Sequence, residues 1–102
     1  MKESTVTLVR VYCSEKDHQY RAVIDLLQRE HAVAGVTAFR GIAGFGDSGR
    51  VHEAGLLDIS LDLPVVVEFF DSPEKVAAVL PLVREMVGPR HVVAWSAQAM
   101  LE

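Results

Sequence analysis

The chain has 102 residues, of which 50% are hydrophobic and 24% are charged. This length is typical of a single domain, and the high apolar content excludes a disordered chain. The net charge of −4 and the lack of any Lys/Arg-rich segment exclude the long-range attraction that draws proteins to nucleic acid or anionic lipid. We therefore expect residues 1–102 to form one domain that has no nucleic-acid partner.

Neither a membrane span nor an export signal is expected. The longest apolar stretches are far below the roughly 18 to 20 residues needed to cross a bilayer. Residues 1–5 contain no apolar run of the kind that a signal peptide carries. The expected location is therefore the cytoplasm, without direct membrane insertion.

The first third of the chain reads as a strand, a helix and a second strand. Residues 5–13 are rich in β-branched and aromatic side chains, which is typical of a strand. Ser14 and Asp17 are residue types that cap helices, and apolar residues then recur at helical spacing. The helix is expected to end at residues 34–35, where a glycine can stop it, and residues 36–42 are predicted to form the second strand.

A glycine-rich segment follows the second strand. Four glycines fall within residues 41–49, too many for a regular element, and they predict a loop that reaches about residue 58. Residues 61–70 then form the third predicted strand. Its apolar side chains fall on both faces: Val65, Val67 and Phe69 on one, Val66 and Phe70 on the other.

The last third predicts a second helix and a fourth strand. Residues 71–74 offer Asp or Ser to cap the helix and Pro for its first turn, and an apolar stripe continues to residue 87. Pro81 lies inside this stripe and predicts a kink or a break. Gly88 and Pro89 end the helix, and residues 91–95 form a strand before a short tail.

The element order βαββαβ predicts an α+β fold, a ferredoxin-like sandwich in which two helices cover one face of a four-stranded antiparallel sheet. The other face would expose Val66, Phe70 and their neighbours, a larger apolar patch than monomers usually carry. A closed homo-oligomer packed sheet to sheet would cover this patch.

Three segments together resemble a known family. They are F-R-G-I-A-G-F-G at residues 39–46, R-V-H at 50–52 and L-P-V-V-V-E at 63–68. They are similar to domain-of-unknown-function family 190, a branch of the PII-like superfamily, and the resemblance covers nearly the whole chain. It implies a PII-like trimer. Relatives in the superfamily bind small anionic ligands, often adenine nucleotides, in the clefts between subunits. They act on a transporter or an enzyme through the loop after strand two.

The candidate ligand-binding residues lie in this loop and in the turn after the second helix. They are Arg40, Gly41, Gly44, Phe45, Gly46 and Arg50 in the loop, and Gly88, Pro89 and Arg90 in the turn. Glycines let backbone N–H groups converge on an anion, and an arginine can bind it in a bidentate manner. The alternative for the glycines is a loop without a ligand. Phe45 could stack on a base or plug a subunit interface.

The turn at 88–90 faces the loop base across the subunit boundary in PII-like folds, although by sequence alone it is a helix stop. The basic clusters with which true PII proteins hold ATP phosphates are not evident, since only Arg90 follows the second helix. The sparse positive charge favours a weakly charged ligand or a modest affinity.

Two other functions remain open. One is a metal-binding or stress-tolerance trimer of the CutA-like architecture, resting on His52, Glu53 and Cys13, although we expect Cys13 to be a buried strand residue. The other is an interaction module without a ligand. The four histidines lack metal-site spacing, and no motif for nucleophilic catalysis or phosphate transfer occurs, so we predict no metal site and no enzyme.

Overall fold

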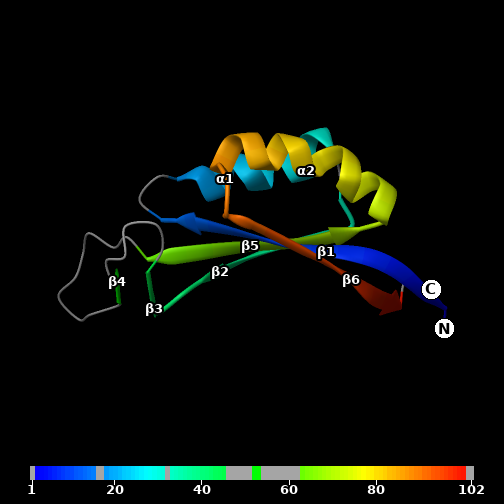
Figure 1. Cartoon of the computed structure of the whole chain (residues 1–102), viewed down its shortest axis with the longest axis horizontal. Helices are drawn as coiled ribbons and strands as arrows, with labels where there is room; N and C mark the ends of the chain where they lie inside the picture. Colours follow the sequence, from blue (N-terminus) through cyan, green and yellow to red (C-terminus); the bar gives the residue numbers. More distant parts are fainter. Residues whose placement is uncertain (1, 16–17, 32, 46–51, 54–62, 101–102) are drawn as a thin grey trace.

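Four long strands form one antiparallel sheet, and two helical segments lie on one of its faces (Figure 1). The computed structural model describes residues 2–15, 18–31, 33–45, 52–53 and 63–100. The elements in chain order are β1 (Glu3–Ser14), α1 (Gln19–Asp25), η1 (Leu26–Glu30), β2 (Gly35–Arg40), β3 (Ala43–Gly44), β4 (His52–Glu53), β5 (Pro64–Asp71), α2 (Pro73–Val87) and β6 (Val92–Met100). The strand order β2-β5-β1-β6 confirms the predicted α+β, ferredoxin-like sandwich.

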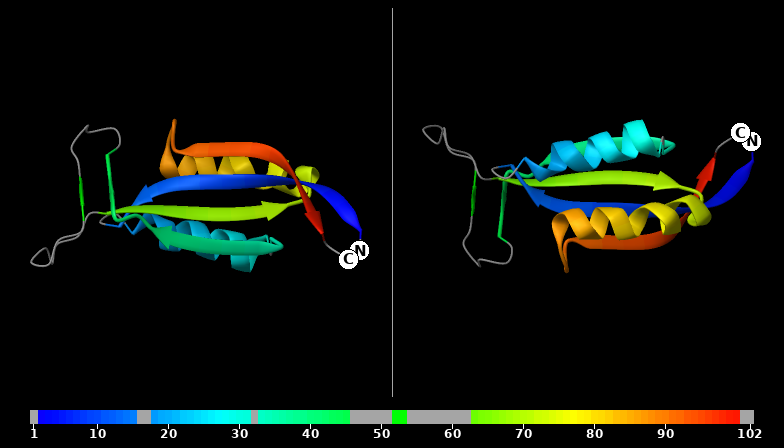
Figure 2. Two further views of the ribbon diagram at one scale, coloured as in Figure 1. Left: turned by 90° about the horizontal axis from the view of Figure 1, so that it is seen from below. Right: turned by 90° about the horizontal axis from the view of Figure 1, so that it is seen from above.

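The first strand occupies the interior of the sheet. β1 pairs with β5 from Thr7 to Ser14, and with β6 from Glu3 to Val11. The outer strands are therefore β2 and β6, which Figure 2 shows at opposite borders of the sheet. β3 and β4 form a separate two-stranded ladder beyond one end of the sheet. None of the described helices is long and apolar enough to cross a membrane.

The core lies between the sheet and the helices. In β5, Val65, Val67 and Phe69 are buried toward the helices, while Val66 and Phe70 are partly exposed on the opposite face, so the predicted distribution of apolar side chains over both faces is confirmed. Burial of each such side chain stabilises the fold by about 1.5–3 kcal/mol. The other core residues are Val9, Val11, Cys13, Val23, Leu27, Val76, Val79, Val83 and Val87.

The second helix begins as predicted but does not break. The Ser72 hydroxyl accepts a hydrogen bond from the Lys75 N–H at 3.3 Å, and Pro73 occupies the first turn. α2 is one continuous element through Pro81, so of the two predicted alternatives, a kink or a break, the break is wrong. Pro81 is exposed, and the buried valines before and after it hold both halves of the helix against the same core.

The first helix is shorter than the sequence indicates. It ends at Glu30 rather than at residues 34–35, and its last five residues, Leu26–Glu30, form a wider π-helical turn. The N–H of Val33 reaches back to the carbonyl of Leu27 at 3.1 Å. Gly35 is the first residue of β2 instead of a helix stop.

The predicted C-terminal tail is largely strand. β6 continues to Met100, well past the predicted end at residue 95, and pairs with β1 as far as Glu3. This second half contains alanine, serine and glutamine, which have little intrinsic preference for strands. Its conformation comes from the pairing with β1, a contact that local propensity does not reveal.

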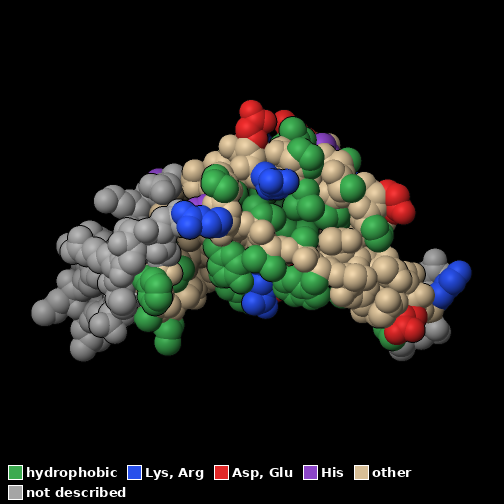
Figure 3. Space-filling model, viewed as in Figure 1, with side chains coloured by type: hydrophobic (Ala, Val, Ile, Leu, Met, Phe, Trp, Pro, Cys, Tyr) green, Lys and Arg blue, Asp and Glu red, His purple; other side chains and the backbone are tan. Residues whose placement is uncertain are grey.

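The face of the sheet away from the helices carries a patch of half-exposed apolar side chains. We call it the open-face patch; it comprises Leu8, Tyr12, Phe39, Val66, Phe70, Val93 and Trp95. Figure 3 shows hydrophobic side chains along this side of the sheet. Arg10 crosses the patch, pairs with Glu68 at 2.8 Å and lies over the Trp95 ring at 5.8 Å. The hydrogen bond to Glu68 is the main reason that the pKa of Arg10 is raised.

Candidate functional site

The loop base begins where β2 separates from β5. Arg40 is the last residue of β2 and lies opposite Val65, the second residue of β5. The next N–H, that of Gly41, donates to the carbonyl of Pro64 at 2.8 Å. This bond ends the ladder one residue after Arg40, which explains why the strand stops before the predicted residue 42.

Two of the candidate glycines pack against the ring of Pro64. A Cβ atom added at Gly41 would lie 2.7 Å from Cγ of Pro64, and one added at Gly44 would lie 3.1 Å from the same atom. The first distance is shorter than real contacts allow, and the proline ring cannot swing aside. These glycines therefore serve the close packing of the loop base on β5, whatever else they bind.

We expect Gly41→Ala to lower the free energy of unfolding by about 1–3 kcal/mol, because the added methyl overpacks against Pro64. The double variant Gly41→Ala/Pro64→Ala should lose less than the sum of the two single variants, which urea denaturation can measure. Gly88→Ala is the control, since no atom lies within 4 Å of its added Cβ and its cost comes from φ alone. Additive losses for residues 41 and 64 would contradict the contact.

Arg40 is ion-paired within the chain. One of its terminal guanidinium nitrogens, Nη2, contacts Oε1 of Glu15, the residue just after β1. The N–H of Glu15 donates to the carbonyl of Leu63 at 2.9 Å, so the backbone of Glu15 is held beside the start of β5. Sequence reasoning did not find Glu15 or Pro64, because only the strand register brings them to Arg40.

The second candidate segment is the turn between α2 and β6. Gly88 has a φ of 83°, a conformation that favours glycine, and its N–H donates to the carbonyl of Arg84 at 2.8 Å. Arg90 has a φ of 66°, which is uncommon for a residue with a side chain. Pro89 lies between them and is exposed. The role of this segment as a helix stop is confirmed.

A pair of bonds fixes the turn to β1. The N–H of Tyr12 donates to the carbonyl of His91 at 2.8 Å, and Nδ1 of the His91 ring lies 3.0 Å from the Tyr12 carbonyl. Because a carbonyl oxygen can only accept, Nδ1 carries the proton in this contact. The start of β6, directly after Arg90, is thereby held at one place on the sheet.

The two candidate segments lie at the same end of the sheet but on opposite borders. Arg40 is in the edge strand β2, and Arg90 precedes the other edge strand, β6. With β5 and β1 between them, the two borders are separated by three strand spacings, about 14 Å. One chain therefore does not bring Arg40 and Arg90 together. Phe45 is 72% exposed, and Gly46 and Arg50 lie outside the described residues.

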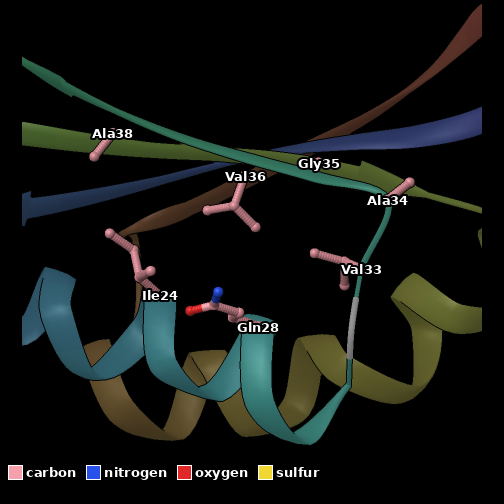
Figure 4. A pocket seen from close by; sticks show the side chains of 7 residues that line it. All are labelled: Ile24, Gln28, Val33, Ala34, Gly35, Val36 and Ala38. Carbon is pink, nitrogen blue, oxygen red and sulfur yellow. The ribbon is translucent and has the colours of Figure 1, made fainter.

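A groove runs between the first helix and the open edge of β2. It has a volume of about 470 Å³. Its lining residues are Ile24, Gln28, Val33, Ala34, Gly35, Val36 and Ala38. Figure 4 shows Ile24 and Gln28 facing Val36 across the groove, and Gln28 has the one polar side chain among these lining residues. None of these lining residues is charged, so we do not expect the groove to bind the small anionic ligand that the sequence predicts.

Cys13 is buried on the helix-facing side of β1, as predicted. Burial raises the pKa of its thiol to about 11, so the thiol stays protonated at neutral pH and is a poor metal ligand. In the described part of the chain, no three His, Cys, Asp or Glu side chains gather as a metal site would require. His52 and Glu53 pair through their backbones with Gly44 and Ala43.

Comparisons with known proteins place these features in a family. The family model DUF190, described as an uncharacterized ACR, matches residues 6–99. A curated relative, UPF0166 protein MJ1524 of Methanocaldococcus jannaschii, is 32% identical over 85 residues, which cover 78% of this chain and 77% of the relative.

The fold is similar to two kinds of solved structure. CPII from Thiomonas intermedia K12, bound to ADP and bicarbonate, has a TM-score of 0.72 at 22% identity, with 96% of this chain and 91% of that chain covered. CutA from Xylella fastidiosa has a TM-score of 0.64 at 16% identity, with 97% and 88% covered. At these identities the likeness concerns the fold.

Proposed function

The chain belongs to the DUF190 family, and from this we propose that it is a PII-like regulator that binds a small anionic ligand between subunits. An adenine nucleotide is the first candidate ligand, because CPII, which shares the fold, was solved with ADP and bicarbonate. The loop after β2 would act on a partner protein, either a membrane transporter or an enzyme. The proposal assigns no catalysis to the chain.

The observation that carries this proposal is the placement of the two arginine segments. They lie at one end of the sheet on opposite borders, too far apart to form one site in a single chain. If the β2 border of one copy faces the β6 border of the next, Arg40 and Gly41 come to the Gly88–Arg90 turn of that neighbour. Two cationic side chains and a stretch of exposed backbone would then line one cleft.

A cyclic trimer satisfies both the cleft and the open-face patch. Three sheets arranged as the walls of a prism turn their open faces inward and their helices outward. Each corner of the prism then joins a β2 border to a β6 border. The half-exposed aromatic and aliphatic side chains of the patch, such as Phe39 and Trp95, are buried by the same arrangement.

A thermal-shift panel on the purified protein tests the ligand assignment. The panel contains ATP, ADP, AMP, cyclic nucleotides, bicarbonate and divalent metal ions, each as a titration. A ligand at about 100 times its Kd stabilises the folded state by about 2.7 kcal/mol, which raises Tm by roughly 10–20 °C for a domain of this size. We expect adenine nucleotides to do so.

Two other outcomes would replace the proposal. The fold likeness to CutA supports a metal-binding trimer as the second candidate, and a shift with divalent metals alone, lost in His52→Ala, would favour it. If no compound in the panel changes Tm, an interaction module without a ligand is favoured.

A further inference from the structure

Arg40 already has an ion-pair partner within the chain, because the Glu15 carboxylate contacts it. The Arg40 side chain is 58% exposed, whereas that of Glu15 is 18% exposed. The carboxylate is therefore the more buried member of the pair, and the guanidinium is the more exposed one. A ligand that reaches Arg40 meets a negative charge directly behind the positive one.

The pair resists separation. Oε2 of Glu15 is buried and has no hydrogen-bond partner among the described residues, so the contact with Arg40 is what balances this carboxylate. Removing the arginine from a largely buried carboxylate leaves an uncompensated charge, which is strongly unfavourable. A bound anion is thus expected to use the remaining N–H groups of Arg40 while the contact with Glu15 persists.

We propose that Glu15 determines which anions the loop base accepts, by repelling a ligand in proportion to its negative charge. This inference rests on the proposed function for its ligand class. Glu15 cancels most of the attraction that Arg40 alone would exert on an anion, and the affinity cancelled in this way grows with each negative charge on the ligand, so polyphosphates lose the most. Each further unit of ligand charge, about 6 Å from the carboxylate, is disfavoured by about threefold even with the screening of bulk water.

The test compares Glu15→Gln with the wild-type protein across adenosine, AMP, ADP and ATP, by calorimetric titration. Glutamine keeps the size of the side chain and removes its charge. The gain in affinity should grow by about threefold for each unit of ligand charge and be absent for adenosine. Glu85→Gln, an exposed residue of α2, makes the same change in net charge and should show no such dependence.

Equal gains for adenosine and ATP, or no gain for either, would overturn the role of Glu15. A second readout requires no nucleotide: the rate at which phenylglyoxal modifies Arg40, followed by peptide mass spectrometry. Loss of the ion pair should make this reaction several-fold faster in Glu15→Gln. If wild-type protein binds no nucleotide, the proposed function fails, and an unchanged modification rate would then separately refute the masking of Arg40.

Discussion

Phe39→Asp is expected to convert the proposed trimer into monomers. Phe39 is 48% exposed in the single chain and lies in the open-face patch opposite Val66, which in turn lies opposite Tyr12. A carboxylate placed there would be buried against the inward faces of the other copies. Burying an unpaired charge costs several kcal/mol per ion, and a cyclic assembly repeats this cost in every copy.

Size-exclusion chromatography with light scattering at micromolar concentration measures this outcome. Val93→Asp, on the opposite border of the same face, should have the same effect. Leu82→Asp is the matched control, because Leu82 is 39% exposed on α2, in the helix layer away from the sheet, and should leave the mass unchanged. A wild-type protein that is already monomeric would refute the sheet-to-sheet assembly outright.

The second prediction with a large expected effect is that two copies of the chain each contribute one arginine to the same ligand site. Arg40→Ala and Arg90→Ala should each abolish stabilisation by ADP, since each removes one side of the cleft. When the two variants are mixed, unfolded and refolded together, binding should return. In a cyclic assembly formed at random from equal amounts, about one quarter of the clefts combine an intact Arg40 with an intact Arg90 of the neighbour.

Calorimetric titration with ADP counts these restored sites. Each variant refolded alone is the control. Arg40→Ala leaves the Glu15 carboxylate unpaired and is expected to be less stable than the wild type, so its circular dichroism at the titration temperature must show a folded protein before loss of binding is attributed to the cleft. If the refolded mixture does not bind ADP, the two arginines lie on the same side of the cleft or outside the site. Binding retained by either variant alone would refute its part in the cleft.

Local signals in the sequence were sufficient to predict most of the helices and strands. The Ser72 cap with Pro73 marks the start of α2, and the two-sided apolar pattern of β5 already indicates an uncovered sheet face. Of the kink or break expected at Pro81, the break is wrong, because packing of the surrounding valines outweighs one missing backbone hydrogen bond. The strand character of β6 beyond residue 95 was missed because it comes from pairing with β1, from Ser96 opposite Thr7 to Met100 opposite Glu3, far apart in the chain.

The candidate site likewise contains residues that the sequence could predict and residues that only long-range contacts reveal. Arg40 and Gly41 could be singled out because their residue types suit an anion and their neighbours match a family. Glu15 could not, since its contact with Arg40 depends on the register of three strands that bring residues 25 apart into one ion pair. A sequence motif identifies arginines that could bind an anion, whereas only the fold shows which of them already have a carboxylate partner.

The pairing of β1 with β6 also bears on how the chain folds. β1 has a strand on each side only once β6 pairs with it, from Val11 opposite Val92 to Glu3 opposite Met100, so its second partner is synthesised much later in the chain. Contacts of such long separation slow folding, because a long loop must close before they form. During synthesis, β1 exposes an unpaired edge rich in valine, the kind of surface on which nascent chains associate with one another. Chaperone dependence during expression would be a direct consequence of placing β1 in the interior of the sheet, next to the late strand β6.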